Sequence, residues 1–407
     1  MAHNTVLGLD VGGDSIKAVV AEPVRDKIKL VYGITKPSFG VRKGVVVSID
    51  DAAKAIGDVL QEIKNFYRPA IKNVFLNISG TNVKTELSKG IVAVARANSE
   101  IGADDVTRAT QASEAIHLEP NRMILHTITK EFTVDGISDI KDPLGMVGSR
   151  LEVTSLIVNA FIPSIKNLRK CVEISGGSIG GLVFNPLASA RAVLTKNQKE
   201  LGVVVIDIGF GTTSIAVYEE DKLIHAAIYP VGAGHITNDI AVALKIPVAV
   251  AEKLKIAYGC AVSKDVPSRE TIDLHKIDAN MTGAPSRRFV AEVIESRLEE
   301  IFEFVDNDLK AVNLSGKLPA GAVLTGGGAK LPGIVDLAKN CLKITAMIGL
   351  PQASSFEVQD QSLLEYVESP DCAAVLGLIL LSMDNGSLKA KPSGKSRLTR
   401  ILRNILP

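Results

Sequence analysis

Two short glycine-containing segments hold the residues best suited to chemistry. The first is DVGGDSIK, from Asp10 to Lys17. Adjacent glycines permit a tight turn whose backbone N–H groups approach a ligand closely, and such concavities bind phosphate. Asp10 follows an aliphatic run and offers the oxygen ligands that magnesium takes, while Lys17 can neutralise phosphate charge. Taken alone, the segment equally fits an ordinary hairpin turn.

A second copy of this pattern lies 197 residues further along the chain. LGLDVGGDSIKAVVAE, from residue 7, matches VVIDIGFGTTSIAVYEE, from residue 204, so that Asp10 corresponds to Asp207. The alignment places one inserted residue in the second turn. Two copies of one hairpin predict a duplicated fold with two similar halves. Facing each other, the two turns would hold the phosphates of a nucleotide between the halves.

A third glycine turn, TGGGAKLPG from Thr325 to Gly333, follows an aliphatic run. Its small residues would allow a nucleoside to approach the backbone closely. By itself it is compatible with a plain connection from strand to helix. Three glycine turns in this order, distributed over two halves, are far more specific than any one of them.

The elements that must position these turns alternate between short β-branched runs and amphipathic stretches, which predicts an α/β fold. A long helix is expected from Arg287, with apolar positions at Val290, Val293, Ile294, Leu298, Ile301, Phe302 and Val305. An inserted α/β module is expected at 83–163. The longest apolar run, 373–383, is too short to cross a bilayer and is interpreted as a buried helix.

Composition excludes several functional classes. A formal net charge of +1, no tryptophan and 4% aromatic residues argue against a nucleic-acid-binding protein. The four cysteines include no CxxC pair, which favours reduced thiols in a cytoplasmic protein over a disulfide framework or zinc site. The first residues lack the basic and apolar regions of a secretory signal.

The order of the three turns is that of the actin, Hsp70 and sugar-kinase superfamily, which this sequence resembles. Within it the chain is most similar to the FtsA family of actin-like bacterial cell-division proteins, over nearly its whole length. The most specific stretches are GVRKGVVVSID (40–50), DPLGMVGSRLEV (142–153), VGAGHITNDIA (231–241), AEKLKIAYGCA (251–261) and LTGGGAKLPGI (324–334). The module at 83–163 fits the additional subdomain of that family.

The resemblance implies an ATP site between two halves of a duplicated ribonuclease-H-like fold. The implied nucleotide-binding residues are Gly12, Gly13, Asp14, Ser15, Lys17, Gly209, Phe210, Gly211, Thr212, Thr213, Glu252, Lys255, Gly326, Gly327 and Gly328. Asp10 and Asp207 would hold magnesium through water. Without the family, Glu252 and Lys255 would fit a surface ion pair, since they lie three residues apart.

Hydrolysis of ATP is expected to be slow if it occurs. The residue that helps to position the attacking water in this superfamily corresponds to Asn185 in the segment between the halves. Asparagine can hydrogen-bond a water but cannot act as a general base. Asp10 or Asp207 would then orient the water through the metal ion.

The last residues, SRLTRILRNILP (396–407), differ in composition from the rest. An apolar stripe with helical spacing and a set of basic residues are expected on this segment: Leu398, Ile401, Leu402, Ile405 and Leu406, with Arg397, Arg400 and Arg403. This pattern is typical of a helix that lies on an anionic membrane. A basic disordered tail, a core-docking helix and a calmodulin-type partner helix are the alternatives. FtsA proteins end in such a linker and membrane-targeting helix.

Together with these features, the resemblance implies an ATP-binding protein that polymerises on the cytoplasmic membrane face at the division site and anchors FtsZ there. By the same resemblance, the FtsZ tail would dock near the long helix. Other division proteins would be further partners. The alternatives are a pilus-assembly adaptor, a small-molecule kinase and a chaperone ATPase. The expected parts are 1–82 with 164–197 (first core), 83–163 (insert), 198–226 with 306–388 (second core), 227–305 (smaller subdomain), 389–395 (linker) and 396–407 (membrane helix).

Overall fold

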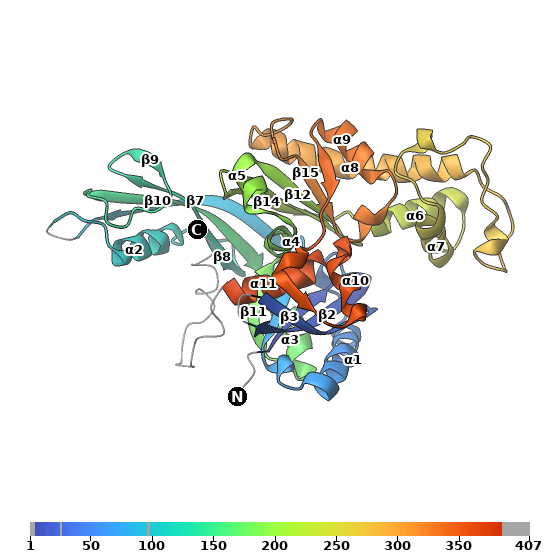
Figure 1. Ribbon diagram of the computed structural model, residues 1–407, viewed down its shortest axis with the longest axis horizontal. Coiled ribbons are helices and arrows are strands. Elements are labelled where there is room, and N and C mark those ends of the chain that lie inside the picture. Colours follow the sequence, from blue (N-terminus) through green and yellow to red (C-terminus); the bar gives the residue numbers. More distant parts are fainter. Residues whose placement is uncertain (1–4, 25–26, 96–97, 385–407) are drawn as a thin grey trace.

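The computed structural model describes residues 5–24, 27–95 and 98–384, and the expected linker and membrane helix lie outside them. The chain forms two α/β halves, and a third unit extends to one side (Figure 1). The sheet of the first half has the order β11 (Ile179–Phe184), β6 (Val74–Ile78), β1 (Val6–Val11), β2 (Ser15–Val24), β3 (Lys27–Pro37) and β17 (Phe356–Val358). The sheet of the second half has the order β14 (Lys222–Tyr229), β13 (Thr213–Glu219), β12 (Val203–Ile208), β15 (Ala322–Thr325) and β16 (Ala346–Ile348).

The two sheets repeat one topology. In each, three consecutive strands pair antiparallel, and two later strands add in parallel beside the first of the three. Only β17, which pairs with β3, has no counterpart in the second sheet as described. The duplication predicted from the paired hairpins is therefore present as two similar sheets.

Helices cover both sheets. The first half contains α1 (Ile49–Tyr67), α3 (Ile162–Ile174), α4 (Asn185–Val193), α10 (Leu364–Val367) and α11 (Ala373–Asp384), together with a small hairpin of β4 (Val41–Arg42) and β5 (Val45–Val46). The second half contains α5 (Lys196–Leu201), α6 (Ala233–Leu244), α7 (Val248–Tyr258), α8 (Arg287–Ala311) and α9 (Ile334–Leu342).

Strand and helix patterns follow from which faces are buried. β12 reads VVVIDI, and all six residues are buried because helices cover both of its faces. In α8 the helical spacing places one stripe of apolar residues in the core, as predicted, although Val293 is only partly buried. Ser286 begins this helix by accepting a hydrogen bond from the Phe289 N–H.

The inserted unit consists of a four-stranded sheet and one helix. Its elements are β7 (Val83–Ala93), α2 (Ala103–Ser113), β8 (Arg122–Val134), β9 (Ile137–Ile140) and β10 (Arg150–Phe161), with the sheet order β7-β10-β8-β9. It has a small core of its own and emerges between β6 and α3 of the first half. It also contacts the edge of the second sheet, where the Thr85 hydroxyl donates to the Ala226 carbonyl at 2.9 Å.

The assignment of 306–388 to the second core needs correction. β17 pairs with β3 of the first sheet, and α11 packs on α4, β1, β2 and β6. All faces of α11 are apolar along most of its length, and the helix is buried there because it lies between the first sheet and α4. The boundaries at 226/227 and 305/306 also fall inside β14 and α8, rather than between elements.

No single described helix is both long and apolar enough to cross a membrane. The bent pair Gln361–Val367 and Pro370–Asp384 meets the criterion only when its two members are taken together. α11, within that pair, is buried in the core.

Close contact between α11 and α4 depends on Gly377. A Cβ atom at this position would lie 1.8 Å from the Ala188 carbonyl oxygen, so the helices must separate to admit it. We expect Gly377→Ala to destabilise the protein by about 3 kcal/mol or more, at the upper end of overpacking effects. Gly57→Ala in α1 is the matched control, because its Cβ would meet nothing closer than 3.4 Å and the substitution should stabilise by about 0.5–1 kcal/mol. Urea unfolding of both variants gives the comparison, and equal stabilities would contradict this packing.

Candidate functional site

A cavity of about 430 Å³ lies between the two halves and is lined by residues of both. The predicted site residues that line it are Asp10, Gly12, Gly13, Asp14, Ser15, Lys17, Asn185, Asp207, Gly209, Phe210, Gly211, Thr212, Glu252, Lys255, Gly326, Gly327 and Gly328. Thr213 is not among them. It begins β13 with its side chain fully buried, so its hydroxyl does not face the cavity.

The two hairpin turns that enter the cavity have the same geometry. The Gly12 N–H donates to the Ser15 carbonyl at 3.1 Å, and the Gly209 N–H donates to the Thr212 carbonyl at 2.9 Å. In the strand pairing, Asp10 faces Lys17 and Asp207 faces Ser214. Both members of the first pair are thus 197 residues before their counterparts in the second pair. The two turns therefore have the same length, and the inserted residue expected from the sequence alignment is not present.

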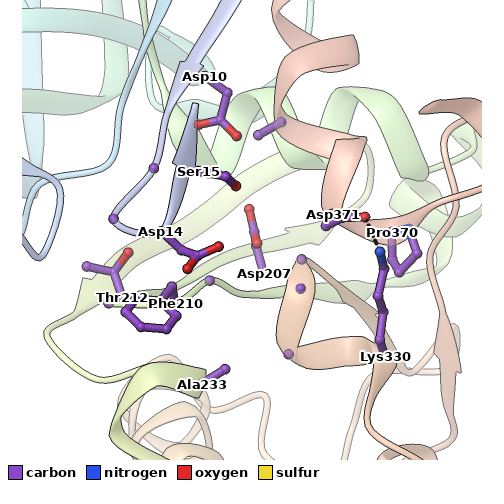
Figure 2. A pocket seen from close by; sticks show the side chains of 18 of the residues that line it. Asp10, Asp14, Ser15, Asp207, Phe210, Thr212, Ala233, Lys330, Pro370 and Asp371 are labelled. Atoms are coloured by element: carbon purple, nitrogen blue, oxygen red, sulfur yellow. Dashed lines mark ion pairs between the residues drawn. The ribbon is translucent and has the colours of Figure 1, made fainter. Parts of the chain in front are cut away.

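The aspartates of the two copies are joined by two asparagines. The Asn77 amide donates to Asp10 Oδ1 at 2.6 Å and to Asn185 Oδ1 at 3.3 Å. The Asn185 amide in turn donates to Asp207 Oδ2 at 2.9 Å, and Ser189 donates to the same oxygen at 2.6 Å. Both carboxylates point into one cavity from opposite halves (Figure 2). Asn185 thus fixes Asp207 and reaches the first half through Asn77.

Burial makes both carboxylates unusually easy to protonate. It raises the pKa of Asp10 to about 6, with the nearby charge of Asp207 adding to the effect. Burial also raises the pKa of Asp207, against the opposing hydrogen bonds from Ser189 and Asn185. A bound cation would relieve this cost because it favours both ionised carboxylates. Oxygen donors in this arrangement fit magnesium held through water, and within the described residues no cluster of three or more acidic, histidine or cysteine ligands is present.

A buried histidine fixes the residue before Asn185. The neutral His126 ring, on β8, accepts a hydrogen bond from the Phe184 N–H at 3.0 Å. Burial lowers the pKa of His126 to about 3. The unfolded chain binds a proton below about pH 6.5 whereas the folded chain does not until about pH 3. Stability is therefore complete above pH 6.5 and is lost as the pH falls toward 3.

This linkage predicts that His126→Gln, which keeps an acceptor but cannot titrate, flattens the pH dependence. Between pH 7 and 5 the parent chain should lose about 2 kcal/mol more than the variant, at about 1.4 kcal/mol per pH unit. Urea unfolding at both pH values measures the difference. Parallel profiles for the two proteins would show that His126 is not buried in the neutral form.

On the side of the cavity formed by α6 and α7, Glu252 and Lys255 form an internal ion pair at 2.8 Å. The Lys255 ammonium group is buried and also donates to the Thr237 hydroxyl at 2.8 Å and to the Ala233 carbonyl at 3.2 Å. The ion pair between Glu252 and Lys255 is therefore present, but its lysine is buried and lines the cavity, unlike the surface pair considered from sequence alone. The ring of Phe210 lies at 6.0 Å from the same ammonium group.

The third glycine turn contacts the second hairpin directly. Gly326 has φ +83°, and a Cβ on it would lie 2.3 Å from Asp207 Oδ1. A Cβ on Gly328 would lie 2.4 Å from the Ile208 side chain. Gly327, between them, has open space. The glycines at 326 and 328 are thus required for the turn to fit against β12.

Several lining residues were not found by sequence reasoning. Asn77 is a single polar residue in the fully buried strand VFLNI, which is a signal that could have been noticed. Lys330, Pro370 and Asp371 lie along another side of the cavity (Figure 2). Asp371 had no such signal, because its segment is brought to the cavity only by the way α11 folds back. Gly44 also lines the cavity, from the turn between β4 and β5.

The predicted membrane-facing residues of 396–407 lie outside the described residues. Their role stays a prediction from the sequence.

Comparisons with known proteins agree with this architecture. Residues 204–377 match the family described as Cell division protein FtsA, and residues 80–159 match the SHS2 domain inserted in FtsA. The chain is 34% identical to the cell division protein FtsA of Pseudomonas aeruginosa, covering 94% of this chain and 90% of that one. For the protein of the same name from Borreliella burgdorferi the identity is 35%, with 98% and 96% covered.

Solved structures share the fold at much lower identity. The PilM–PilN type IV pilus biogenesis complex aligns with a TM-score of 0.66 and 17% identity, covering 92% of this chain and 97% of that chain. MreB5 of Spiroplasma citri bound to ADP aligns with a TM-score of 0.54 and 12% identity, covering 94% and 97%. The expected actin-like fold is confirmed. With two relatives above 30% identity over almost the whole chain, this protein belongs to the FtsA family of cell division proteins.

Proposed function

We propose that this chain binds ATP with magnesium in the cavity between its halves and, in that form, assembles on the cytoplasmic face of the membrane at the division site to anchor FtsZ. The observation that carries the nucleotide part is the pairing of Asp10 and Asp207 in one cavity by two copies of one glycine hairpin. The backbone turns at 12–15 and 209–212 would hold phosphates. The turn at 326–328 and the helix residues Glu252 and Lys255 would contact the nucleoside.

The charge of the cavity supports a requirement for magnesium. Its lining includes five acidic side chains (Asp10, Asp14, Asp207, Glu252, Asp371) and three lysines (Lys17, Lys255, Lys330). A polyphosphate entering this excess of negative charge would be repelled unless a divalent cation accompanied it. Asp10 and Asp207 are the residues that would hold the cation through water. When bound, it would offset charge on the phosphates.

The hydrogen bonds of Asn185 support the proposal that ATP turnover is slow, if it occurs. Both amide protons are directed at Asp207 and Ser214, and the carbonyl oxygen accepts from Asn77. The side chain has one acceptor position left for a water, and it cannot remove a proton. Asn185 is proposed to position that water and the Asp207 carboxylate, while the chain works mainly as a scaffold.

Membrane attachment is proposed for 396–407. Each basic side chain near an anionic leaflet contributes about 1 kcal/mol. So short a helix is marginal in water, and one tail should therefore bind weakly. Many tails on one filament would bind tightly through their effective concentration. Weak single anchors thus fit a protein that polymerises. FtsZ would dock on the smaller part of the second half, near α8, and other division proteins would join the assembly.

Recruitment of FtsZ to lipid tests this proposal as a whole. Vesicles containing anionic lipid are sedimented with FtsZ, ATP and magnesium, with or without the full-length chain. We expect FtsZ to pellet with the vesicles only when the chain is present, and not when the chain ends at Lys395. If the chain pellets with the vesicles but FtsZ stays in the supernatant, the proposed anchoring of FtsZ is contradicted.

A further inference from the structure

A carboxylate outside the predicted phosphate turns holds two of the three lysines of the cavity. Asp371 forms an ion pair with Lys17 at 3.3 Å and with Lys330 at 2.7 Å. Figure 2 shows Asp371 and Lys330 joined at one side of the cavity that Asp10 and Asp207 enter. The Ser369 hydroxyl also donates to Asp371 Oδ1. The three donors leave Asp371 well fixed.

The chain positions Asp371 at the junction of the two halves. The elements on either side of it, β17 and α11, belong to the first half. The neighbouring Pro370 carbonyl accepts hydrogen bonds from the Gly326 N–H at 3.0 Å and the Thr325 hydroxyl at 2.7 Å, both in the second half. Asp371 therefore pairs with one lysine from each half, and its place beside the glycine turn is set by backbone contacts.

Both lysines are thereby engaged in ion pairs with Asp371. The side chain of Lys17 is only 13% exposed, and burial alone would lower its pKa, but the carboxylates of Asp10 and Asp371 outweigh burial and raise it. Burial opposes ionisation of Asp371, but Lys17 and Lys330 outweigh it and lower its pKa to about 2. Lys17 and Asp371 consequently both stay charged near neutral pH. A phosphate that approaches Lys17 finds the lysine already paired with a carboxylate.

We propose that Asp371 is an internal counter-ion that competes with the nucleotide phosphates for Lys17 and Lys330, so that nucleotide binding exchanges these ion pairs. The inference rests on the proposed binding of ATP in this cavity. Exchange has two consequences. Affinity for the nucleotide is lower than the lysines alone would give, because the ion pairs must be released first. Release of the Lys330 pair also removes an ionic contact between the halves.

Substitution of Asp371 should strengthen ATP binding, whereas loss of a side chain from a binding site usually weakens it. We expect Asp371→Asn to bind ATP about 5–10-fold more tightly than the parent chain, by the free energy of a partly buried ion pair. Glu368→Gln is the matched control. This substitution removes one negative charge at a position three residues before Asp371. The Glu368 side chain is exposed and has no ion pair in the described structure.

The measurement is calorimetric titration of the full-length proteins with ATP and magnesium, and separately with inorganic tripolyphosphate. Tighter binding by Asp371→Asn but not by Glu368→Gln, for both ligands, supports the exchange. Equal affinities for the two variants would mean that only the net charge of the protein matters, and would overturn the proposed exchange of ion pairs. Weaker binding by Asp371→Asn would overturn it too, because Asp371 would then be needed to position Lys17. If the parent chain binds neither ligand, the proposed nucleotide site itself fails.

A second variant keeps the proposal testable if Asp371→Asn does not fold. Ser369→Ala removes the hydroxyl that fixes Asp371 and leaves every charge in place. Asp371 should then hold the lysines less firmly, and ATP should bind about 2-fold more tightly, in line with the loss of one modest hydrogen bond. Unchanged or weaker binding by this variant would argue against the exchange.

Discussion

Replacing Gly326 with alanine is expected to abolish detectable ATP binding and to destabilise the fold. The added Cβ would lie 2.3 Å from Asp207 Oδ1 and 2.6 Å from the Ile208 carbonyl oxygen, and φ at this position is +83°. With ψ at 173°, this backbone lies in a region that is essentially restricted to glycine, and an alanine held there costs about 1–3 kcal/mol. Relief of the contact must move the carboxylate or the turn, and both line the cavity. We expect a loss of at least about 2 kcal/mol of stability.

Gly327→Ala is the matched control for the fold. Its Cβ would meet no atom within 4 Å, and its φ lies outside the left-handed region. Stability should stay within about 0.5 kcal/mol of the parent chain. Thermal unfolding of the two variants, followed by ATP titration of whichever folds, separates the effects. A Gly326→Ala protein as stable as Gly327→Ala, with normal ATP affinity, would show that the turn does not press on Asp207.

Asp207→Asn is expected to reduce magnesium-dependent ATP affinity by about 10–100-fold. This is the usual range for a carboxylate that holds a metal ion through water rather than by direct ligation. The substitution preserves volume. One oxygen remains to accept the hydrogen bonds of Asn185 and Ser189, so the local structure should persist. Because burial raises the pKa of Asp207, the ionised carboxylate is costly in the protein without cation. We therefore expect the variant to be as stable as the parent chain, or more so.

The loss of affinity without loss of stability distinguishes this variant from a folding defect. Asp221→Asn serves as the control, since Asp221 lies in the turn after β13, with φ +62°, a backbone that asparagine also tolerates. Calorimetric titration with ATP at several magnesium concentrations and urea unfolding provide the two readouts. Normal magnesium dependence in Asp207→Asn would remove Asp207 from the proposed metal site.

The sequence was sufficient for those parts of the fold that repeat or that show a clear period. The matching hairpins at Asp10 and Asp207 predicted two similar halves, and glycine spacing placed three turns on one cavity. The apolar spacing from Val290 to Val305 predicted α8. Local signals were enough here because turns and helix faces are determined by residues close together in the chain.

Features set by distant contacts were not predictable in this way. α11 looks like any buried helix, and its sequence does not say which sheet it covers. Asp371 reaches the cavity only because α11 folds back on the first half. Thr213 follows Thr212 in a run of hydroxyl residues typical of a phosphate turn, but it is the first residue of β13 and its side chain is buried. The alignment gap in the second hairpin arose because aliphatic strand residues match equally well at two registers.

Co-sedimentation of the chain with anionic vesicles tests the central claim most directly. The full-length protein is compared with a chain that ends at Lys395, each with and without ATP and magnesium. The account predicts that only the full-length chain pellets with lipid, and that its binding rises more steeply with protein concentration when ATP and magnesium are present. If both chains stay in the supernatant under every condition, 396–407 does not bind membrane, and an adaptor role that depends on a membrane anchor is contradicted.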